Sequence, residues 1–256
     1  MQLTGGNNIA VIGSRKYSSY GKECTRYFCD TFVKNDICVV SGMAEGIDAC
    51  AHWSAINNNG KTIAVLACGI DYIYPSSNRN LYEEICKTGL VISEFPLSVR
   101  PQKPYFPYRN RIIAGLSDCL VVAEAGLPSG TLTTVDHCLE QNKNVYAIPG
   151  SIHSTTSAGS NFLIKSGCIC AVDPYDILAE FGRFRVDKDS GPIPDDENLD
   201  DLQKDILKLL CVESLSVYQL EESLSVDAAS LNVALVMLEI NGYVIKDAGA
   251  NYYLKR

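Results

Sequence analysis

The sequence contains no apolar run of the roughly 18–20 residues that a helix needs to span a bilayer. Its first residues, MQLTGGNN, also lack the basic-then-apolar order of a secretory signal. We therefore expect a cytoplasmic protein that does not associate with a membrane. The 256 residues exceed the roughly 100–150 typical of one domain, so we expect one large domain and one small one.

A metal-binding pattern is missing as well. The chain has only 3 histidines, and its 11 cysteines show neither a CxxC pair nor a Cys/His ligand spacing. Five of the cysteines lie in apolar stretches: Cys24, Cys38, Cys68, Cys119 and Cys138. Cysteines in such surroundings are typical of small core residues rather than of a disulfide framework. We expect no metal site.

The dinucleotide-binding fingerprint GxGxxG is absent from the first predicted strand-to-helix turn. The second predicted strand ends in Ser41 and Gly42, where a dinucleotide-binding domain usually has an acidic residue for the ribose. NAD and FAD are therefore not expected, and no cofactor is predicted.

Positive charge is not in excess, since 22 Lys and Arg face 30 Asp and Glu, for a net charge of −8. The distribution is uneven. Residues 1–186 hold 16 basic and 16 acidic side chains, whereas 187–256 hold 6 and 14. A neutral domain still binds DNA if its arginines converge on one face, so the acidic balance does not exclude a nucleic-acid partner.

Short apolar runs alternate with helix-length segments through most of the chain. They lie at 9–13, 38–42, 62–67, 90–94, 119–124, 144–150 and 168–172. Runs without polar alternation are typical of strands covered on both faces. We therefore predict an α/β class for residues 1–186, with a Rossmann-like, doubly wound, mainly parallel sheet whose ligands lie beyond the carboxyl ends of the strands.

Residues 187–199 combine acid, proline and glycine and are predicted to be a linker. The pattern of residues 200–256 predicts three helices and a β-hairpin, which together make a small winged-helix domain. The recognition helix, about 227–241, has no Lys or Arg. Because reading a DNA groove requires basic side chains, we expect this module to dock on protein.

Three loops at the predicted carboxyl edge have features of phosphate sites. They contain Gly13, Ser14 and Arg15; Ser41, Gly42 and Gly46; and Asn78 with Arg79. Backbone amides at a helix start attract anions, and an arginine forks onto phosphate oxygens. The alternatives are a surface turn with an incidental arginine for the first loop and ordinary helix capping for the second.

The densest cationic cluster contains Arg109, Asn110 and Arg111, together with the rings of Phe106 and Tyr108. Arginines beside aromatic rings suit unpaired nucleotides, because phosphates take the charge and bases stack on the rings. A solvated loop beside a helix start is the alternative. Further along, Ser129, Gly130 and Thr131 open another helix and are expected to hold a phosphate through amides and hydroxyls.

In this order, the motifs resemble those of the DNA-processing protein A (DprA/Smf) family. The carrying segments are GSR (13–15), SGMAEGID (41–48), GIDYIYPSSN (69–78), SEFP (93–96), FPYRNRIIAGLS (106–117), EAGLPSGTLTT (124–134) and PGSIHSTTSAGSNFLIKSG (149–167). The resemblance covers nearly all of residues 8–181. One departure is that family members commonly carry a helical domain ahead of the Rossmann part, whereas this chain starts almost at the first strand.

This resemblance implies a protein that binds single-stranded DNA, forms a homodimer, and helps to load a RecA-type recombinase in natural transformation. The family's DNA pocket would correspond to Gly13, Ser14 and Arg15, to the 41–48 turn, to Asn78 and Arg79, and to Arg109, Asn110 and Arg111.

A rival interpretation comes from the Lonely Guy (lysine-decarboxylase-like) nucleotide hydrolases, whose PGGxGTxxE motif resembles residues 128–134. Aligned on Gly130 and Thr131, the catalytic glutamate position is occupied by Thr134, preceded by Thr133. A hydroxyl does not supply the acid/base chemistry of a carboxylate. We therefore expect no catalytic residues and no enzymatic activity, and keep nucleotide binding or hydrolysis as the alternative.

Overall fold

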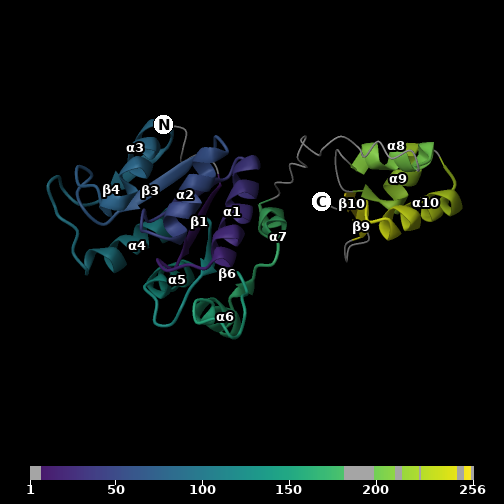
Figure 1. Cartoon of the computed structure of the whole chain (residues 1–256). Helices are drawn as coiled ribbons and strands as arrows, with labels where there is room; N and C mark the ends of the chain where they lie inside the picture. Colours follow the sequence, from purple (N-terminus) through teal and green to yellow (C-terminus); the bar gives the residue numbers. More distant parts are fainter. Residues whose placement is uncertain (1–6, 182–198, 211–214, 225, 247–250, 255–256) are drawn as a thin grey trace. The chain divides into compact units, whose positions relative to one another are not determined.

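The computed structural model describes residues 7–181, 199–210, 215–224, 226–246 and 251–254 (Figure 1). The chain divides into two units, residues 1–183 and 184–256, and each is described by itself. Most of the predicted linker, 187–199, lies outside the described residues. Its last member, Leu199, is buried in the core of the second unit and therefore belongs to that core.

A seven-stranded, all-parallel sheet forms the centre of the first unit, with the strand order β4-β3-β2-β1-β5-β6-β7. The strands are β1 (Asn8–Gly13), β2 (Cys38–Ser41), β3 (Thr62–Leu66), β4 (Leu90–Ser93), β5 (Cys119–Glu124), β6 (Val145–Ala147) and β7 (Ile169–Cys170). Each strand lies within or next to one predicted apolar run, and the predicted Rossmann-like, doubly wound sheet is confirmed.

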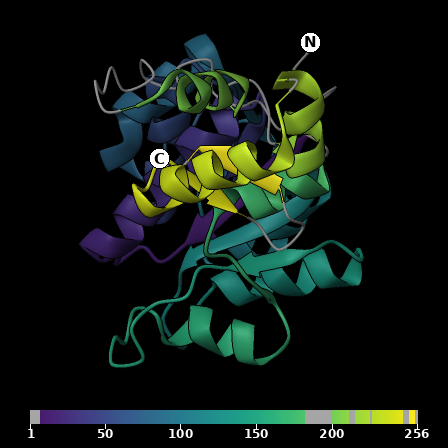
Figure 2. The ribbon, with the colours of Figure 1, turned by 90° about the vertical axis from the view of Figure 1, so that its right-hand side faces the viewer.

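Helices cover both faces of this sheet (Figure 2). One face packs against α1 (Ser19–Lys34), α2 (Ile47–Asn57), α3 (Arg79–Thr88) and α7 (Pro174–Glu180), and the other against α4 (Tyr105–Leu116), α5 (Thr131–Glu140) and α6 (Ala158–Lys165). A short 3-10 turn, η1 (Ser76–Asn78), precedes α3. Successive strand residues such as Val121 and Val122 enter opposite cores, which explains why the strands are apolar throughout.

The order of the strands places a topological switch at β1. This strand pairs with β2 on one side and with β5 on the other, because the chain first winds outward to β4 and then returns. Loops that leave the carboxyl ends of β1 and β5 diverge here, which opens a crevice in folds of this class. The candidate site is therefore expected at this edge.

The predicted core cysteines lie inside the first unit. Cys38, Cys68, Cys119 and Cys138 are buried and Cys24 is half-buried, and all five are free thiols. Burial raises the pKa of the Cys38 thiol to about 12, so it stays protonated at neutral pH. These residues act as small apolar side chains.

The described residues of the second unit form three helices and a three-stranded antiparallel sheet, in the order β8-β10-β9. Its elements are α8 (Asp201–Leu210), β8 (Leu215–Ser216), α9 (Val217–Leu224), α10 (Ala228–Ile240), β9 (Val244–Lys246) and β10 (Asn251–Leu254). This is the element order of the predicted winged helix, with β8 as an additional strand that the sequence pattern did not indicate. Asp227 caps α10 by accepting hydrogen bonds from the backbone N–H groups of Ala229 and Ser230.

Helix α10 is apolar on two faces. One face buries Leu231, Ala234, Leu235 and Leu238, whereas Val233, Val236, Met237 and Ile240 are exposed. No single helix among the described residues is long and apolar enough to cross a membrane, and α9 with α10 meets that criterion only as a pair bent by 117°.

His52 of α2 is a buried polar residue of the first unit. Its Nδ1 lies 2.6 Å from Oγ1 of Thr62, which in turn donates to the carbonyl of Val39. Its Nε2 has no hydrogen-bond partner among the described residues. Burial, and to a lesser extent the positive charge of Arg109, lowers the pKa of His52 to about 3.

The folded protein therefore keeps His52 neutral, whereas the unfolded chain protonates it near pH 6.5. Between that pH and about 3 the unfolded state binds the additional proton, so stability is lost as the pH falls. We predict that the free energy of unfolding decreases by up to about 1.4 kcal/mol per pH unit below pH 6. Urea unfolding of wild type and His52→Asn at pH 7 and pH 5 measures this, with the exposed His153→Asn as the control. An equal pH dependence in wild type and His52→Asn would contradict the prediction.

Candidate nucleic-acid interface

A cleft opens at the carboxyl edge of the sheet, between the loops that follow β1, β2 and β3 and the start of α4. It is lined by Arg15, Gly42, Met43, Ala44, Glu45, Leu66, Ala67, Cys68, Tyr74, Pro75, Pro101 and Phe106. We call it the Arg15 cleft, because Arg15 is the one cation among these residues. Its wall combines an exposed guanidinium with aromatic rings and a largely apolar floor.

The turn that carries Arg15 is fixed by two close backbone contacts. The backbone N–H of Ser14 donates to the carbonyl of Glu124 over 2.7 Å. On the other side, a Cβ on Gly46 would lie 2.3 Å from the carbonyl oxygen of Ser14 and 2.7 Å from Cα of Arg15. Gly46 also has a φ of +89°, which L side chains rarely adopt. Glycine at this position is therefore required by both space and conformation.

The Arg15 side chain lies against an aromatic pair. Its guanidinium carbon is 5.3 Å from the centroid of the Phe106 ring, within the range of a cation–π contact. The Phe106 ring in turn lies 5.7 Å from that of Tyr74 at a tilt of 57°. One cation and two rings thus face the same cleft, although they come from three separate segments of the chain.

Arg109, by contrast, is directed into the protein. Its side chain is only 4% exposed, and its Nη1 donates to the carbonyls of Gly42, at 2.7 Å, and of Val65. The sequence suggested that Arg109 binds phosphate, and the structure corrects this interpretation. Nη1 thus binds the ends of β2 and β3, while Nε donates to Oδ1 of Asn110, so Arg109 joins α4 to the sheet.

A buried carboxylate accompanies this arginine. Asp48 of α2 is 6% exposed, and a Cβ on Gly42 would lie within 2.7 Å of both Asp48 Oδ2 and Arg109 Nη2. Burial raises the pKa of Asp48, while the charge of Arg109 and nearby backbone N–H groups oppose that rise. Burial likewise lowers the pKa of Arg109 to about 10, so it stays charged at neutral pH. Gly42 is small because these two groups pack against it.

Two more predicted site residues support the cleft from behind. Asn78 donates through Nδ2 to the carbonyls of Met43 and Ala44, at 3.0 and 3.3 Å, and so holds the turn after β2. Ser41 is buried and donates to the carbonyl of Val11 over 2.7 Å. Both position the cleft rather than face into it.

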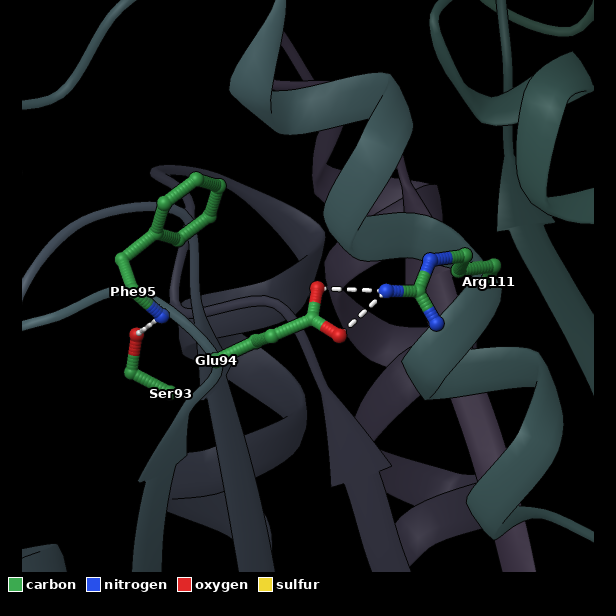
Figure 3. Close-up of polar contacts among 4 residues, drawn as sticks. All are labelled: Ser93, Glu94, Phe95 and Arg111. Carbon is green, nitrogen blue, oxygen red and sulfur yellow. Dashed lines mark hydrogen bonds and ion pairs between the residues drawn. The ribbon is translucent and has the colours of Figure 1, made fainter.

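Arg79 and Arg111 are accessible but do not line the Arg15 cleft. Arg79 is exposed and lies 3.9 Å from Glu83, one turn along α3. Arg111 forms an ion pair with Glu94, which directly follows β4 (Figure 3). The arginines of the predicted DNA pocket are therefore distributed over separate parts of the edge.

The loop after β5 forms its own set of contacts. Ser129 Oγ accepts from the backbone N–H of Thr131 and lies 2.9 Å from its hydroxyl, while Gly130 has open space around its Cα. Asn110 of α4 donates to Thr133 over 2.8 Å and ties this loop region to α4. None of these residues lines the Arg15 cleft.

Glu124, the last residue of β5, was not predicted as a site residue. It is 1% exposed and accepts from the backbone N–H and hydroxyl of Ser18, at 2.8 and 2.7 Å, and from Thr156 over 2.6 Å. It therefore connects the loops after β1 and β6 at the topological switch. A carboxylate that ends an otherwise apolar strand is the signal that could have revealed it, because a buried charge requires hydrogen-bond donors.

Within the described ranges, no group of three or more His, Cys, Asp or Glu side chains is arranged to hold a metal ion. The chemistry available in the Arg15 cleft is therefore that of a guanidinium, backbone groups and aromatic rings, with Glu45 as its one carboxylate. Such groups bind phosphate and planar bases.

We predict that Arg109→Ala destabilises the fold by about 3–5 kcal/mol, because it leaves the carbonyls of Gly42 and Val65 without their donor and removes the charge that offsets the burial of Asp48. Arg15→Ala, in contrast, should change stability by no more than about 0.5 kcal/mol, since Arg15 is exposed. Urea unfolding of the two variants beside wild type measures the difference. Equal stability of both variants would show that Arg109 does not stabilise the fold more than the exposed Arg15 does.

The chain matches the model of the family described as DNA recombination-mediator protein A over residues 1–182. It is 43% identical over 173 residues to DNA processing protein DprA of Streptococcus pneumoniae, which covers 68% of this chain and 61% of that protein. It is 44% identical over 171 residues to protein Smf of Escherichia coli, covering 66% and 46%. The chain thus spans between about half and three fifths of these relatives' lengths.

A solved structure is also similar. DNA processing protein A from Helicobacter pylori, described for its single-stranded DNA binding mode, superposes with a TM-score of 0.66 at 28% identity. The alignment covers 70% of this chain and 82% of the other.

Proposed function

Since the chain belongs to the DNA recombination-mediator protein A (DprA/Smf) family, we propose that it binds single-stranded DNA and acts as a recombination mediator. In this role it protects incoming DNA and helps to load a RecA-type recombinase during natural transformation. The observation that carries the proposal is the Arg15 cleft, in which a guanidinium lies on the Phe106 ring beside Tyr74.

The chemistry of the cleft favours an unpaired strand. Bases in a duplex are stacked on each other, whereas those of a single strand are free to stack on protein rings, at about 1–3 kcal/mol per base. Tyr74 is 40% exposed, so its ring is accessible to a base. Arg15 beside it can take the adjoining phosphate. The single-stranded DNA binding described for the Helicobacter pylori relative supports this assignment.

The partners follow from the same proposal. A protein that hands single strands to a recombinase has to contact both, and we propose a RecA-type recombinase as the second partner and a homodimer as the working form. The acidic second unit, whose α10 exposes apolar rather than basic residues, is suited to contact protein. The cytoplasm is the compartment in which these partners would meet.

We further propose that the protein is not an enzyme. Thr134, at the position of the hydrolases' glutamate, is 2% exposed. Thr133 is already engaged, because its hydroxyl donates to the carbonyl of Gly130 and accepts from Asn110. Neither residue offers an acid or a base to a nucleotide, so Lonely Guy hydrolysis is not favoured.

Arg15→Ala is predicted to weaken the affinity for a labelled oligo-dT by about 10- to 100-fold, since it removes a charge-assisted contact to phosphate. Phe106→Ala should cost about 1–3 kcal/mol of binding through lost stacking. Fluorescence anisotropy at low and moderate salt measures both effects, and binding should weaken as salt rises because phosphate contacts release counterions.

The matched control is Arg26→Ala, which removes an exposed arginine on α1 that does not line the cleft. It should bind like wild type. If Arg15→Ala and Phe106→Ala, both folded, also bind like wild type, the Arg15 cleft is not the binding site.

Incubation with AMP is predicted to release no free adenine, because the catalytic position, in the first turn of α5, is occupied by Thr134 and not by a carboxylate. Chromatography of the reaction mixture measures this. Adenine release by wild type that is abolished in Gly130→Asp would refute the proposal of a binding protein without catalysis.

A further inference from the structure

Two arginines lie on aromatic rings of α4. Arg15 lies 5.3 Å from the ring centroid of Phe106, and Arg111 lies 4.4 Å from that of Tyr108. The Tyr108 ring is 53% exposed and belongs to a cluster with Phe95, whose ring centroid is 6.3 Å away. The second pair thus repeats the combination of cation and ring that defines the Arg15 cleft.

The difference between the two pairs is an acidic residue. Nη2 of Arg111 donates to both carboxylate oxygens of Glu94, the residue that follows β4 (Figure 3). Glu45, the carboxylate that lines the Arg15 cleft, accepts a hydrogen bond from the hydroxyl of Ser77 instead, and among the described residues Arg15 forms no ion pair. A carboxylate and a phosphate offer a guanidinium the same pair of anionic oxygens. Glu94 therefore occupies on Arg111 the place that a nucleotide phosphate would take.

The contact between Glu94 and Arg111 is suited to exchange. Both side chains are accessible to water, with exposed fractions of 42% and 39%. The carboxylate meets a single nitrogen, Nη2, instead of the two-nitrogen fork that makes the strongest guanidinium–carboxylate pairs. Exposed ion pairs contribute little free energy, so an incoming phosphate can replace the carboxylate at a small free-energy cost.

We propose that Glu94 is an intramolecular competitor for DNA: it holds Arg111 on Tyr108 in the free protein and is displaced by a phosphate of the bound single strand. This inference rests on the proposed function, because it concerns the same ligand. Glu94 lowers the affinity of a second phosphate site and keeps Arg111 from binding isolated anions. The bound single-stranded DNA gains the contact with Arg111 after it has bound to Arg15 and to the rings of Phe106 and Tyr74.

The test is a double-mutant cycle with a labelled oligo-dT, measured by fluorescence anisotropy at low salt. Glu94→Gln keeps the size of the side chain but removes the competing charge, and we expect about two- to fivefold tighter binding. In Arg111→Ala the guanidinium for which Glu94 and DNA compete is absent. Adding Glu94→Gln to that variant should therefore not increase the affinity for oligo-dT. Glu84→Gln, which removes the same charge from an exposed pair with Lys87, is the control and should bind like wild type.

Weaker or unchanged binding of Glu94→Gln would overturn the inference, since weaker binding means that Glu94 only positions Arg111. A gain that persists in the Arg111→Ala background would also overturn it, because it would reflect general charge. Arg15→Ala separates the two proposals. If it loses affinity while Glu94→Gln changes nothing, only the competitor fails; if wild type does not bind the oligonucleotide at all, the proposed function fails and the competitor with it.

Discussion

The buried guanidinium of Arg109, with the Asp48 carboxylate nearby, is the group on which the edge of the sheet depends. Arg109 binds the carbonyls at the ends of β2 and β3, so α4 is held against the two strands whose loops form the cleft. The placement of α4 fixes the positions of Phe106, Tyr108 and Arg111. The buried charge of Arg109 therefore positions one wall of the Arg15 cleft. The free-energy cost of removing this charge from water is offset by Asp48 and by backbone carbonyls.

Most of the fold could be predicted from the sequence, because the strands of a parallel sheet are buried on both faces and appear as uninterrupted apolar runs. β5 was predicted with its observed bounds, 119–124, whereas β6 and β7 are shorter than their runs. Ile148 and Ala171, just after β6 and β7, are apolar because they pack in the core, and each donates one last backbone hydrogen bond to the neighbouring strand. Strand ends depend on hydrogen-bond pairing, which a hydrophobic pattern does not encode.

The site was only partly predictable. Arg15 and Phe106 were found because each stands in a loop or helix start with an evident chemical role. Arg109 and Arg111 have similar sequence neighbourhoods but opposite roles, since residues two apart on a helix lie about 200° apart around its axis. One therefore points into the sheet and the other outward. The carboxylates of Glu94 and Glu124 were missed because their partners are distant in the sequence.

Helix α10 has a consequence for how the second unit folds. Its buried and exposed faces are both apolar, so the helix alone carries no strong preference for which face turns inward. Its rotation about its own axis must be selected by the shapes of the residues that α8, α9 and β9 present to it. The energy gap between the native rotation and its competitors is consequently set by packing complementarity and not by hydrophobicity, and that gap is what makes a folded state unique.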